Sequence, residues 1–208
     1  RGGWGNGGLV WWAWGGLLGL IVLLGFNQAA IAMGVLARLP VAVYPFAKRF
    51  TWWPQVFLGL AFNWGAMLAW TAHAGTLHAP AIVLYLAGIA WTLFYDTIYA
   101  HQDAEDDALI GVKSTALLFG ENSGKWLRRF LMATVGLMGI AVVYAGLPEA
   151  SVLALAIALG GPWAMGWHMA WQLRGLDTTD NAKLLQLFRA NRDTGIIPLL
   201  FFAVALLA

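Results

Sequence analysis

The sequence predicts an all-α fold, a polytopic bundle of transmembrane helices that forms a single domain over residues 1–208. Two features of the composition predict this class. Hydrophobic residues make up 61% of the chain, with a mean hydropathy of +0.70, and charged residues make up only 11%. Soluble domains carry about 25% charged residues, so this chain has too few charges to cover a soluble surface. Cysteine is absent, which excludes disulfide frameworks, thiolate metal sites and a cysteine nucleophile.

Seven stretches are apolar over roughly the length that a spanning helix needs, about 20 residues, although the last is short. The predicted spans are residues 9–26, 29–46, 53–72, 81–100, 130–146, 151–171 and 195–208. Polar breaks separate them, and in chain order these read FNQAA, AKRFTWWP, HAGTLHAP, HQDAEDDALIGVKSTALLFGENSGKW, GLPEA and QLRGLDTTDNAKLLQLFRANRDT. A soluble protein would have nothing to cover seven such helices, so we expect seven membrane crossings.

The charged residues occur in every second break. The second, fourth and sixth breaks are long or basic, whereas the others carry one charge between them, Glu149. Threading the chain back and forth therefore places Arg1 and all the charged breaks on one face, with Arg38 and Glu149 as exceptions. Lys and Arg concentrate on the cytoplasmic side of membranes. We therefore expect the charged face to be cytoplasmic in a bacterial inner membrane, with the mitochondrial inner membrane as the alternative.

The stretch YDTIYAHQDAEDD gathers half of the acidic residues where the fourth predicted span ends. If one helix continues through it, Asp96, Asp103 and Asp107 lie in one row, because spacings of seven and eleven residues return to nearly the same direction. Carboxylates at a membrane boundary mark a functional site by default. Oxygen ligands suit Mg²⁺, which proteins usually hold with one or two carboxylates and substrate phosphates. The row therefore predicts a Mg²⁺ site for a phosphorylated ligand, and a solvated acidic loop is the alternative.

Basic and hydroxyl side chains on the same face are candidate phosphate ligands. Tyr44 and Lys48 are neighbours on a helix at a spacing of four residues. Lys113 follows the acidic stretch, and FRANRD supplies Arg189 and Arg192. Arg suits bidentate phosphate contact, and Lys acts as a point charge. For each residue taken singly, ordinary anchoring at the membrane interface is an equally simple interpretation.

Three segments together resemble the UbiA superfamily of intramembrane prenyltransferases: VYPFAKRFTWWPQVFLGLAFNWG, YDTIYAHQDAEDDALIGVKSTALLFGE and FRANRD. The likeness covers about residues 41–193 and favours the branch that acts on 4-hydroxybenzoate. It implies a nine-helix bundle with a central cavity open to lipid. It also implies Mg²⁺-dependent transfer of a polyprenyl group from polyprenyl diphosphate to the ring of 4-hydroxybenzoate, in ubiquinone biosynthesis.

The resemblance assigns roles to residues of this sequence. Asp96, Asp103 and Asp107 match one of two Asp-rich motifs that hold Mg²⁺ and the diphosphate, and Tyr44 and Lys48 match a Tyr-x-x-x-Lys pair. For the mechanism we expect Arg192 and Lys113 to contact phosphate as well. Aromatic side chains could steady the allylic cation, and the candidates are Trp64, Trp91, Phe94 and Tyr95. His101 is a candidate acceptor contact, whereas His168, inside a span, is expected to be hydrogen-bonded structure.

The sequence departs from the family at the first Asp-rich motif, of the form Asn-Asp-x-x-Asp-x-x-x-Asp. No acidic residue precedes Asp96. The simplest expectation is a fragment that lacks the family's first two helices, corresponds to the last seven, and is inactive alone. A non-catalytic membrane homologue is a second possibility. A transporter or channel with a cation pathway past Asp96 and Asp103 is a third. No feature suggests a nucleic-acid partner.

Overall fold

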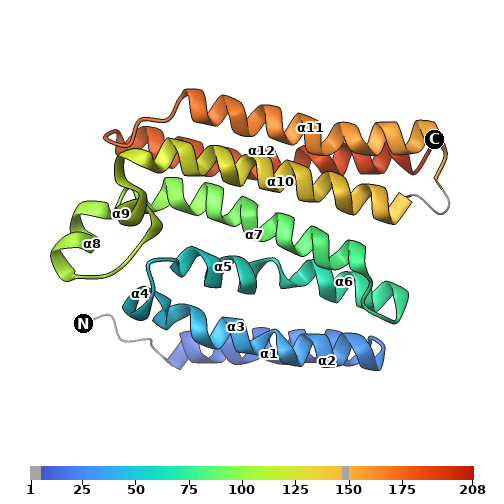
Figure 1. The fold of residues 1–208 in the computed structure, drawn as a ribbon. Helices are drawn as coiled ribbons and strands as arrows, with labels where there is room; N and C mark the ends of the chain where they lie inside the picture. Colours follow the sequence, from blue (N-terminus) through green and yellow to red (C-terminus); the bar gives the residue numbers. More distant parts are fainter. Residues whose placement is uncertain (1–5, 147–149) are drawn as a thin grey trace.

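The computed structural model describes residues 6–146 and 150–208, and over these ranges the chain folds into helices without a strand. The chain runs back and forth in seven passes (Figure 1). The first is α1 (Asn6–Leu24), and the second joins α2 (Gln28–Leu36), α3 (Arg38–Val43), the 3-10 turn η1 (Tyr44–Phe46) and α4 (Ala47–Phe50). The third joins α5 (Pro54–Phe62) and α6 (Trp64–Ala74), and the others are α7 (Ala79–Ala100), α10 (Ser123–Gly146), α11 (Val152–Arg174) and α12 (Asn181–Ala205).

The predicted all-α polytopic membrane bundle is confirmed. Within the described residues, four stretches are long and apolar enough to cross a membrane, Gln28–Phe50, Ala79–Ala100, Thr115–Gly146 and Val152–Arg174, and a shorter apolar helix covers Ala13–Leu24. Large hydrophobic side chains are exposed along the passes, including Trp11, Phe62 and Trp163. Exposed apolar surface of this extent is expected where lipid replaces water as the solvent.

The central element of the bundle is α7. It packs against α10 and α12 on one side and against α5 and α6 on the other (Figure 1). Half of its length is buried, with Phe94 and Ile98 completely enclosed. Met165 and Met169 of α11 and Leu184 and Leu187 of α12 extend the same core. Because α7 packs against the third, fifth and seventh passes, its side chains reach several sides of the molecule, and this positions the candidate site.

Asn63 interrupts the third pass between α5 and α6. Its side-chain amide donates hydrogen bonds to the Gly59 carbonyl at 2.9 Å and to Thr92 Oγ1 of α7 at 2.8 Å. Gly88 of α7 gives this side chain room, because a Cβ atom at position 88 would lie 2.3 Å from Asn63 Oδ1. The third pass is thus tied to α7 by a polar contact inside the apolar bundle.

Three predicted boundaries are wrong. The helix of the fourth span does not continue through the acidic stretch: α7 ends at Ala100, and a separate helix, α8 (Ala104–Ile110), follows after a turn. Carboxylates are unfavourable at a helix C-terminus and favourable at an N-terminus. Restarting the helix at Ala104 places Glu105, Asp106 and Asp107 in a first turn.

The other two corrections concern where helices begin. After α9 (Thr115–Phe119) and the 3-10 turn η2 (Gly120–Asn122), α10 begins at Ser123 and not at residue 130. The last helix begins at Asn181, capped by the Asp180 side chain, and not at residue 195. The FRANRD sequence is therefore helical. Both helices begin in polar, basic sequence, because a helix can continue beyond the apolar zone.

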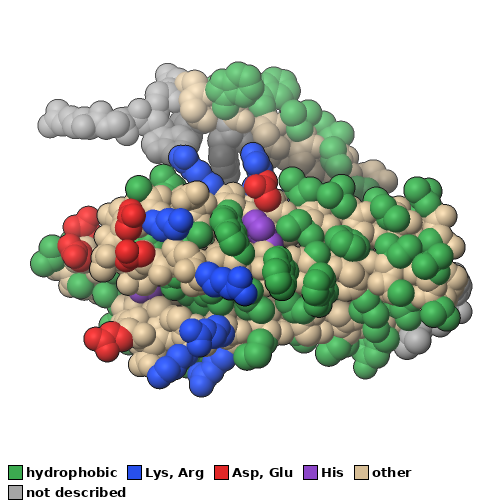
Figure 2. Space-filling view, turned by 90° about the horizontal axis from the view of Figure 1, so that it is seen from above, with side chains coloured by type: hydrophobic (Ala, Val, Ile, Leu, Met, Phe, Trp, Pro, Cys, Tyr) green, Lys and Arg blue, Asp and Glu red, His purple; other side chains and the backbone are tan. Residues whose placement is uncertain are grey.

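The charges gather as the sequence predicts. Figure 2 shows Lys, Arg, Asp and Glu side chains toward one end of the long axis, and mainly hydrophobic side chains at the other end. Arg38 is exposed in the second pass. Arg1 and Glu149 lie outside the described residues.

Candidate active site

A small pocket of about 130 Å³ lies where the second pass, α5 and α7 meet, near the charged end. Its lining residues are Tyr44, Pro45, Lys48, Pro54, Gln55 and Asp96. Tyr44 and Lys48 reach it from successive turns, η1 and α4, and Asp96 lies one turn before the end of α7. Three of the residues that the sequence singled out, far apart in the chain, thus line one pocket.

Asp96 is the carboxylate of this pocket. It is partly buried, and among the described residues its oxygens take part in no hydrogen bond or ion pair. The Lys48 ammonium is close enough to act on it through its charge. A partly buried carboxylate without a direct partner is free to bind a cation or a donor group of a ligand.

Asp107, unlike Asp96, lies in an ion pair. Its carboxylate accepts two hydrogen bonds from Lys48 Nζ, at 3.0 and 3.3 Å, and its side chain is 8% exposed against 44% for Lys48. Two backbone bonds fix the loop around this ion pair. The Lys113 N–H donates to the Lys48 carbonyl at 3.1 Å, and the Val112 N–H donates to the Asp107 carbonyl at 3.0 Å. The ion pair therefore holds the loop against α4 and also fixes Lys48 at the pocket.

Asp103 stands at the start of α8, exposed, with its carbonyl bonded to the Asp107 N–H at 2.8 Å. No group of three or more acidic or histidine side chains in the described residues is placed to hold a metal ion. The single row of three carboxylates is therefore not formed, because the turn after Ala100 separates Asp96 from α8. The side chains of this pocket that could bind a metal ion nevertheless do so through oxygen atoms, those of Asp96, Tyr44 and Gln55. That donor set fits a Mg²⁺ ion that takes its other ligands from water and phosphate.

The sequence GVKST connects this site to the core. Thr115 Oγ1 lies 2.7 Å from Thr97 Oγ1 of α7, and the Thr115 N–H donates to Gln55 Oε1 at 3.3 Å. Gln55, Thr97 and Thr115 are all buried. Gln55 was not singled out from the sequence. Its position directly after Pro54, inside an apolar stretch, is the signal that would have pointed to it.

A larger cavity of about 910 Å³ lies between the break of the third pass and α7, α11 and α12. Its lining residues are Phe62, Asn63, Trp91, Tyr95, His168, Trp171, Gln186, Phe188, Arg189, Ala190, Asn191, Arg192 and Asp193. Tyr95 of this cavity and Asp96 of the small pocket are consecutive in α7, so both spaces are lined by the same part of that helix. A ligand that fills both would have one end among the polar side chains of the small pocket and its other part against the aromatic side chains of the cavity.

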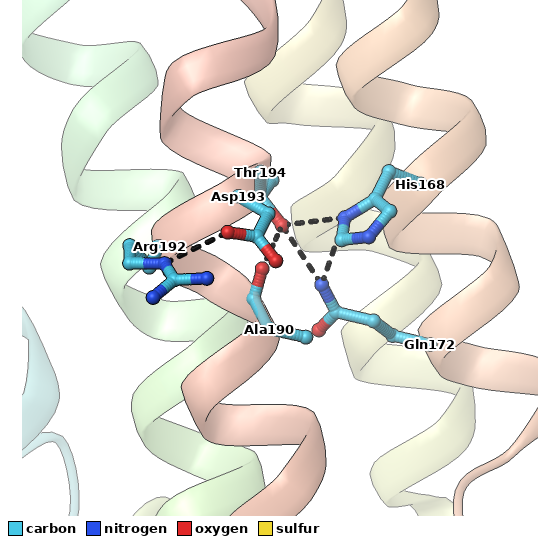
Figure 3. Close-up of polar contacts among 6 residues, drawn as sticks. All are labelled: His168, Gln172, Ala190, Arg192, Asp193 and Thr194. Atoms are coloured by element: carbon cyan, nitrogen blue, oxygen red, sulfur yellow. Dashed lines mark hydrogen bonds and ion pairs between the residues drawn. The ribbon is translucent and has the colours of Figure 1, made fainter.

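The other predicted residues divide between these spaces. Arg192 is exposed in the cavity, with its Nε donating to Asp193 Oδ1 at 2.8 Å (Figure 3). Lys113 lines neither space, and its ammonium lies 5.7 Å from the centre of the Trp52 ring. Of the aromatic candidates, Trp91 and Tyr95 line the cavity.

Three further predicted residues lie elsewhere. Phe94 is in the core, and Trp64 donates its indole N–H to the Met33 carbonyl at 2.9 Å. His101 lines a separate polar pocket and bonds Ser123 Oγ at 3.0 Å. Burial lowers the pKa of the His101 imidazole.

A buried polar network forms one wall of the cavity. It joins Trp91 to Asn191, Asn191 to Gln172, and Gln172 to Thr194 and His168. Figure 3 shows the α11 and α12 members pointing toward one another between the two helices. The sequence analysis missed Asn191 and Gln172. Both lie in the sixth polar break of the sequence, where an amide side chain does not stand out.

Comparisons with known proteins show which family the chain is similar to. Residues 6–192 match the model of the UbiA prenyltransferase family. The chain is 46% identical over 181 residues to the mitochondrial 4-hydroxybenzoate polyprenyltransferase of Bos taurus, covering 86% of this chain and 47% of that protein. The protein of the same name from Arabidopsis thaliana is 46% identical over 183 residues, covering 87% of this chain and 43% of that protein. The protein of the same name from Rattus norvegicus is 45% identical over 190 residues, covering 91% of this chain and 48% of that protein. The chain thus spans about half the length of these relatives. No solved structure matches the chain significantly.

Proposed function

This chain belongs to the UbiA prenyltransferase family, and from that premise we propose that its protein transfers a polyprenyl group from polyprenyl diphosphate to the ring of 4-hydroxybenzoate, in ubiquinone biosynthesis. One observation carries the proposal. Tyr44, Lys48 and Asp96 line a pocket at the charged end, and the residue before Asp96 in α7, Tyr95, lines a larger cavity with aromatic side chains. A lipid-borne diphosphate and a planar aromatic acid need these two surroundings side by side.

In this proposal the small pocket binds the diphosphate of the donor. The Lys48 ammonium and the Tyr44 hydroxyl contact its oxygens and stabilise the negative charge that develops as it leaves. Asp107 keeps Lys48 in place through the ion pair. Arg192 and Lys113 remain candidates for further phosphate contacts. The isoprenoid tail lies in hydrocarbon, as its apolar surface requires.

Mg²⁺ is the cofactor that we propose. Asp96 would hold it at the pocket, with Asp103 and Asp107 of the neighbouring loop as the other candidate ligands. A bound Mg²⁺ neutralises diphosphate charge and acts as a Lewis acid on the leaving oxygen. The structure supports Asp96 most directly, since Asp107 is already paired with Lys48 and Asp103 is exposed.

The large cavity would receive the aromatic acceptor. The allylic carbon separates from the diphosphate oxygen, the ring carbon ortho to the phenol hydroxyl bonds to it, and that ring carbon releases its proton. Trp91 and Tyr95 present aromatic faces on the cavity wall, where they can stabilise a cation. Water has to be kept from the cation, since it would otherwise capture it before the ring does.

A cation pathway is not favoured. Such a pathway needs ionisable groups along the depth of the membrane. Most acidic residues here lie in or beside the loops of the charged end. Asp193, farther along α12, is paired with Arg192.

The protein is an integral membrane protein. The expectation of a bacterial inner membrane finds no support among the relatives, whose names say mitochondrial. We therefore propose the mitochondrial inner membrane or one of equivalent topology, with the charged end on the side where Lys and Arg are retained.

The proposal is tested with the full natural protein in detergent, radiolabelled polyprenyl diphosphate and 4-hydroxybenzoate. Product is expected only with Mg²⁺ present. Asp96→Asn should reduce kcat roughly 100-fold or more, as loss of a charge-stabilising group does. Glu105→Gln, an exposed residue outside the pocket, is the matched control and should leave the rate unchanged. Wild-type turnover by Asp96→Asn would contradict the proposed site.

A further inference from the structure

The polar network beside the large cavity has a defined direction. The Trp91 indole N–H is a donor only, and it lies 3.0 Å from Asn191 Oδ1. The Asn191 oxygen must therefore face Trp91, and its amide nitrogen must face Gln172, where it donates to Oε1 at 3.1 Å. The Gln172 oxygen is then occupied as an acceptor. Its amide nitrogen must point the other way, toward Thr194 and His168.

This direction, together with the contacts of Thr194, assigns the proton of His168 to one of its two nitrogens. Gln172 Nε2 donates to Thr194 Oγ1 at 2.9 Å and lies 3.4 Å from His168 Nδ1. A hydrogen on Nδ1 would face the hydrogens of the Gln172 amide. Thr194 Oγ1 is also 2.8 Å from His168 Nδ1, closer than the 3.2 Å to the Ala190 carbonyl. The Thr194 hydroxyl has one hydrogen, and assigning it to the shorter contact makes Nδ1 the acceptor; in a neutral imidazole the hydrogen is then on Nε2.

The Nε2–H of His168 has no hydrogen-bond partner in the described part of the chain, and His168 lines the large cavity. The imidazole stacks on Trp171, with ring centroids 5.3 Å apart and planes inclined by 26°, so the ring is held on two sides. The same cavity contains aromatic walls at Trp91 and Phe188, the exposed Arg189, and the Asp193 carboxylate, which is paired with Arg192. A planar ligand with an oxygen anion matches this combination.

We propose that His168 binds the aromatic acceptor by donating its Nε2–H to the carboxylate of that molecule, and that Gln172 is a positioning residue that sets the His168 tautomer. The proposal rests on the proposed function, because it assumes an aromatic acid in the cavity. A carboxylate accepts hydrogen bonds and does not donate them. His168 in this tautomer therefore selects an acid over an acceptor that lacks the carboxylate.

The test is steady-state kinetics of the full natural protein in detergent, with radiolabelled polyprenyl diphosphate. His168→Phe retains a flat ring and removes the donor. It should raise the KM for 4-hydroxybenzoate roughly 10- to 100-fold, as loss of a hydrogen bond to a charged group does, and leave the KM for the diphosphate within about twofold. His168→Gln places an amide N–H near the position of Nε2 and should recover most of the affinity.

A variant that leaves His168 in place tests the role of Gln172. Gln172→Glu still accepts from Asn191, but it offers Nδ1 an acceptor instead of a donor. The His168 proton then moves to Nδ1, and the KM for 4-hydroxybenzoate should rise as it does in His168→Phe. Trp163→Phe, on the exposed side of α11, is the control and should behave as the wild type.

An acceptor analogue separates binding from general damage. With 4-methylphenol, which has no carboxylate, the wild type and His168→Phe should show equal KM values. A variant that misfolds would be impaired with both acceptors. In that case His168→Asn, whose side chain can still bond Gln172 and Thr194 but is too short to reach the Nε2 position, replaces it with the same expectation.

Two results would overturn the inference. One is an unchanged KM for 4-hydroxybenzoate in His168→Phe, and the other is a rise in the KM for the diphosphate instead. Either leaves the proposed function standing, because the wild type still makes product. Failure of the wild type to prenylate 4-hydroxybenzoate would instead refute the proposed function itself.

Discussion

The ion pair between Lys48 and Asp107 gives the sharpest prediction, because it separates stability from activity. In Lys48→Met the Asp107 carboxylate, 8% exposed, loses the ammonium that donates to both of its oxygens at 3.0 and 3.3 Å. Removing one partner of a fully buried pair destabilises by about 3–5 kcal/mol. Lys48 is 44% exposed, so water replaces part of the loss, and we expect about 2–3 kcal/mol, near the value for hydrogen bonds to charged groups.

The assay is thermal unfolding in detergent, followed by tryptophan fluorescence. A loss of about 2–3 kcal/mol lowers the Tm of a chain of this size by roughly 4–12 °C. The double variant Lys48→Met/Asp107→Leu removes both charges and should recover the Tm, since replacing a buried ion pair by apolar groups is often neutral. It should remain inactive, because Lys48 is the proposed diphosphate ligand.

Two outcomes would refute this reasoning. An unchanged Tm in Lys48→Met would mean that the ion pair does not hold the loop after α7. Recovery of prenyl transfer in the double variant would remove Lys48 from diphosphate binding. A Mg²⁺ titration of Asp107→Asn gives a further check. If Asp107 acts only as the partner of Lys48, the variant keeps the wild-type Mg²⁺ requirement. If Asp107 is a metal ligand, the variant needs a higher Mg²⁺ concentration.

Three other predictions follow from close contacts and from burial. Gly88→Ala should destabilise the bundle by about 1–3 kcal/mol, measured as a lower Tm, because the new Cβ would lie 2.3 Å from Asn63 Oδ1. Gly195→Ala should reduce prenyl transfer, measured with radiolabelled donor, because its Cβ would lie 2.7 Å from the Trp91 ring and displace it. Burial lowers the pKa of His101, so the unfolded chain binds its proton more readily. Stability is then complete above pH about 6.5 and lost as the pH falls below it, and Tm measurements should show a smaller loss in His101→Gln.

The glycine predictions have matched controls. A Cβ at Gly65 or at Gly136 meets nothing within 4 Å, and alanine at either position should leave the Tm and the rate near wild type. Destabilisation of equal size at these positions would show that helix glycines in general, and not the contacts, are responsible. For His101, an identical pH profile in the variant would exclude this imidazole as the titrating group.

The sequence predicted the parts of the site that depend on periodicity and on charge. Tyr44 and Lys48 are one helical turn apart, and alternation of charged breaks placed them at the same end as Asp96. The row of three carboxylates failed because it assumed an unbroken helix. Whether a helix continues past a membrane boundary depends on its end charges and on the packing of the next segment. Asp107 was therefore placed beside Asp96, whereas it pairs with Lys48.

The network at the large cavity was beyond prediction for a different reason. Trp91 and Asn191 are separated by 100 residues, and their contact depends on how α7 packs against α12. In the sequence, Asn191 and Gln172 lie in a polar break, and nothing distinguishes a residue that faces a cavity from one that faces solvent or the core. Only the packed bundle gives the direction of the hydrogen bonds.

The polar contact of Asn63 has a consequence for how the protein enters its membrane. Neither α5 nor α6, at 9 and 11 residues, is long enough to cross a bilayer, which takes about 20. A lone asparagine amide in hydrocarbon is unfavourable until it finds a partner, and the partner on α7 is Thr92. The two segments on either side of the loop at Gly75 are therefore expected to leave the insertion machinery together, as a helical hairpin.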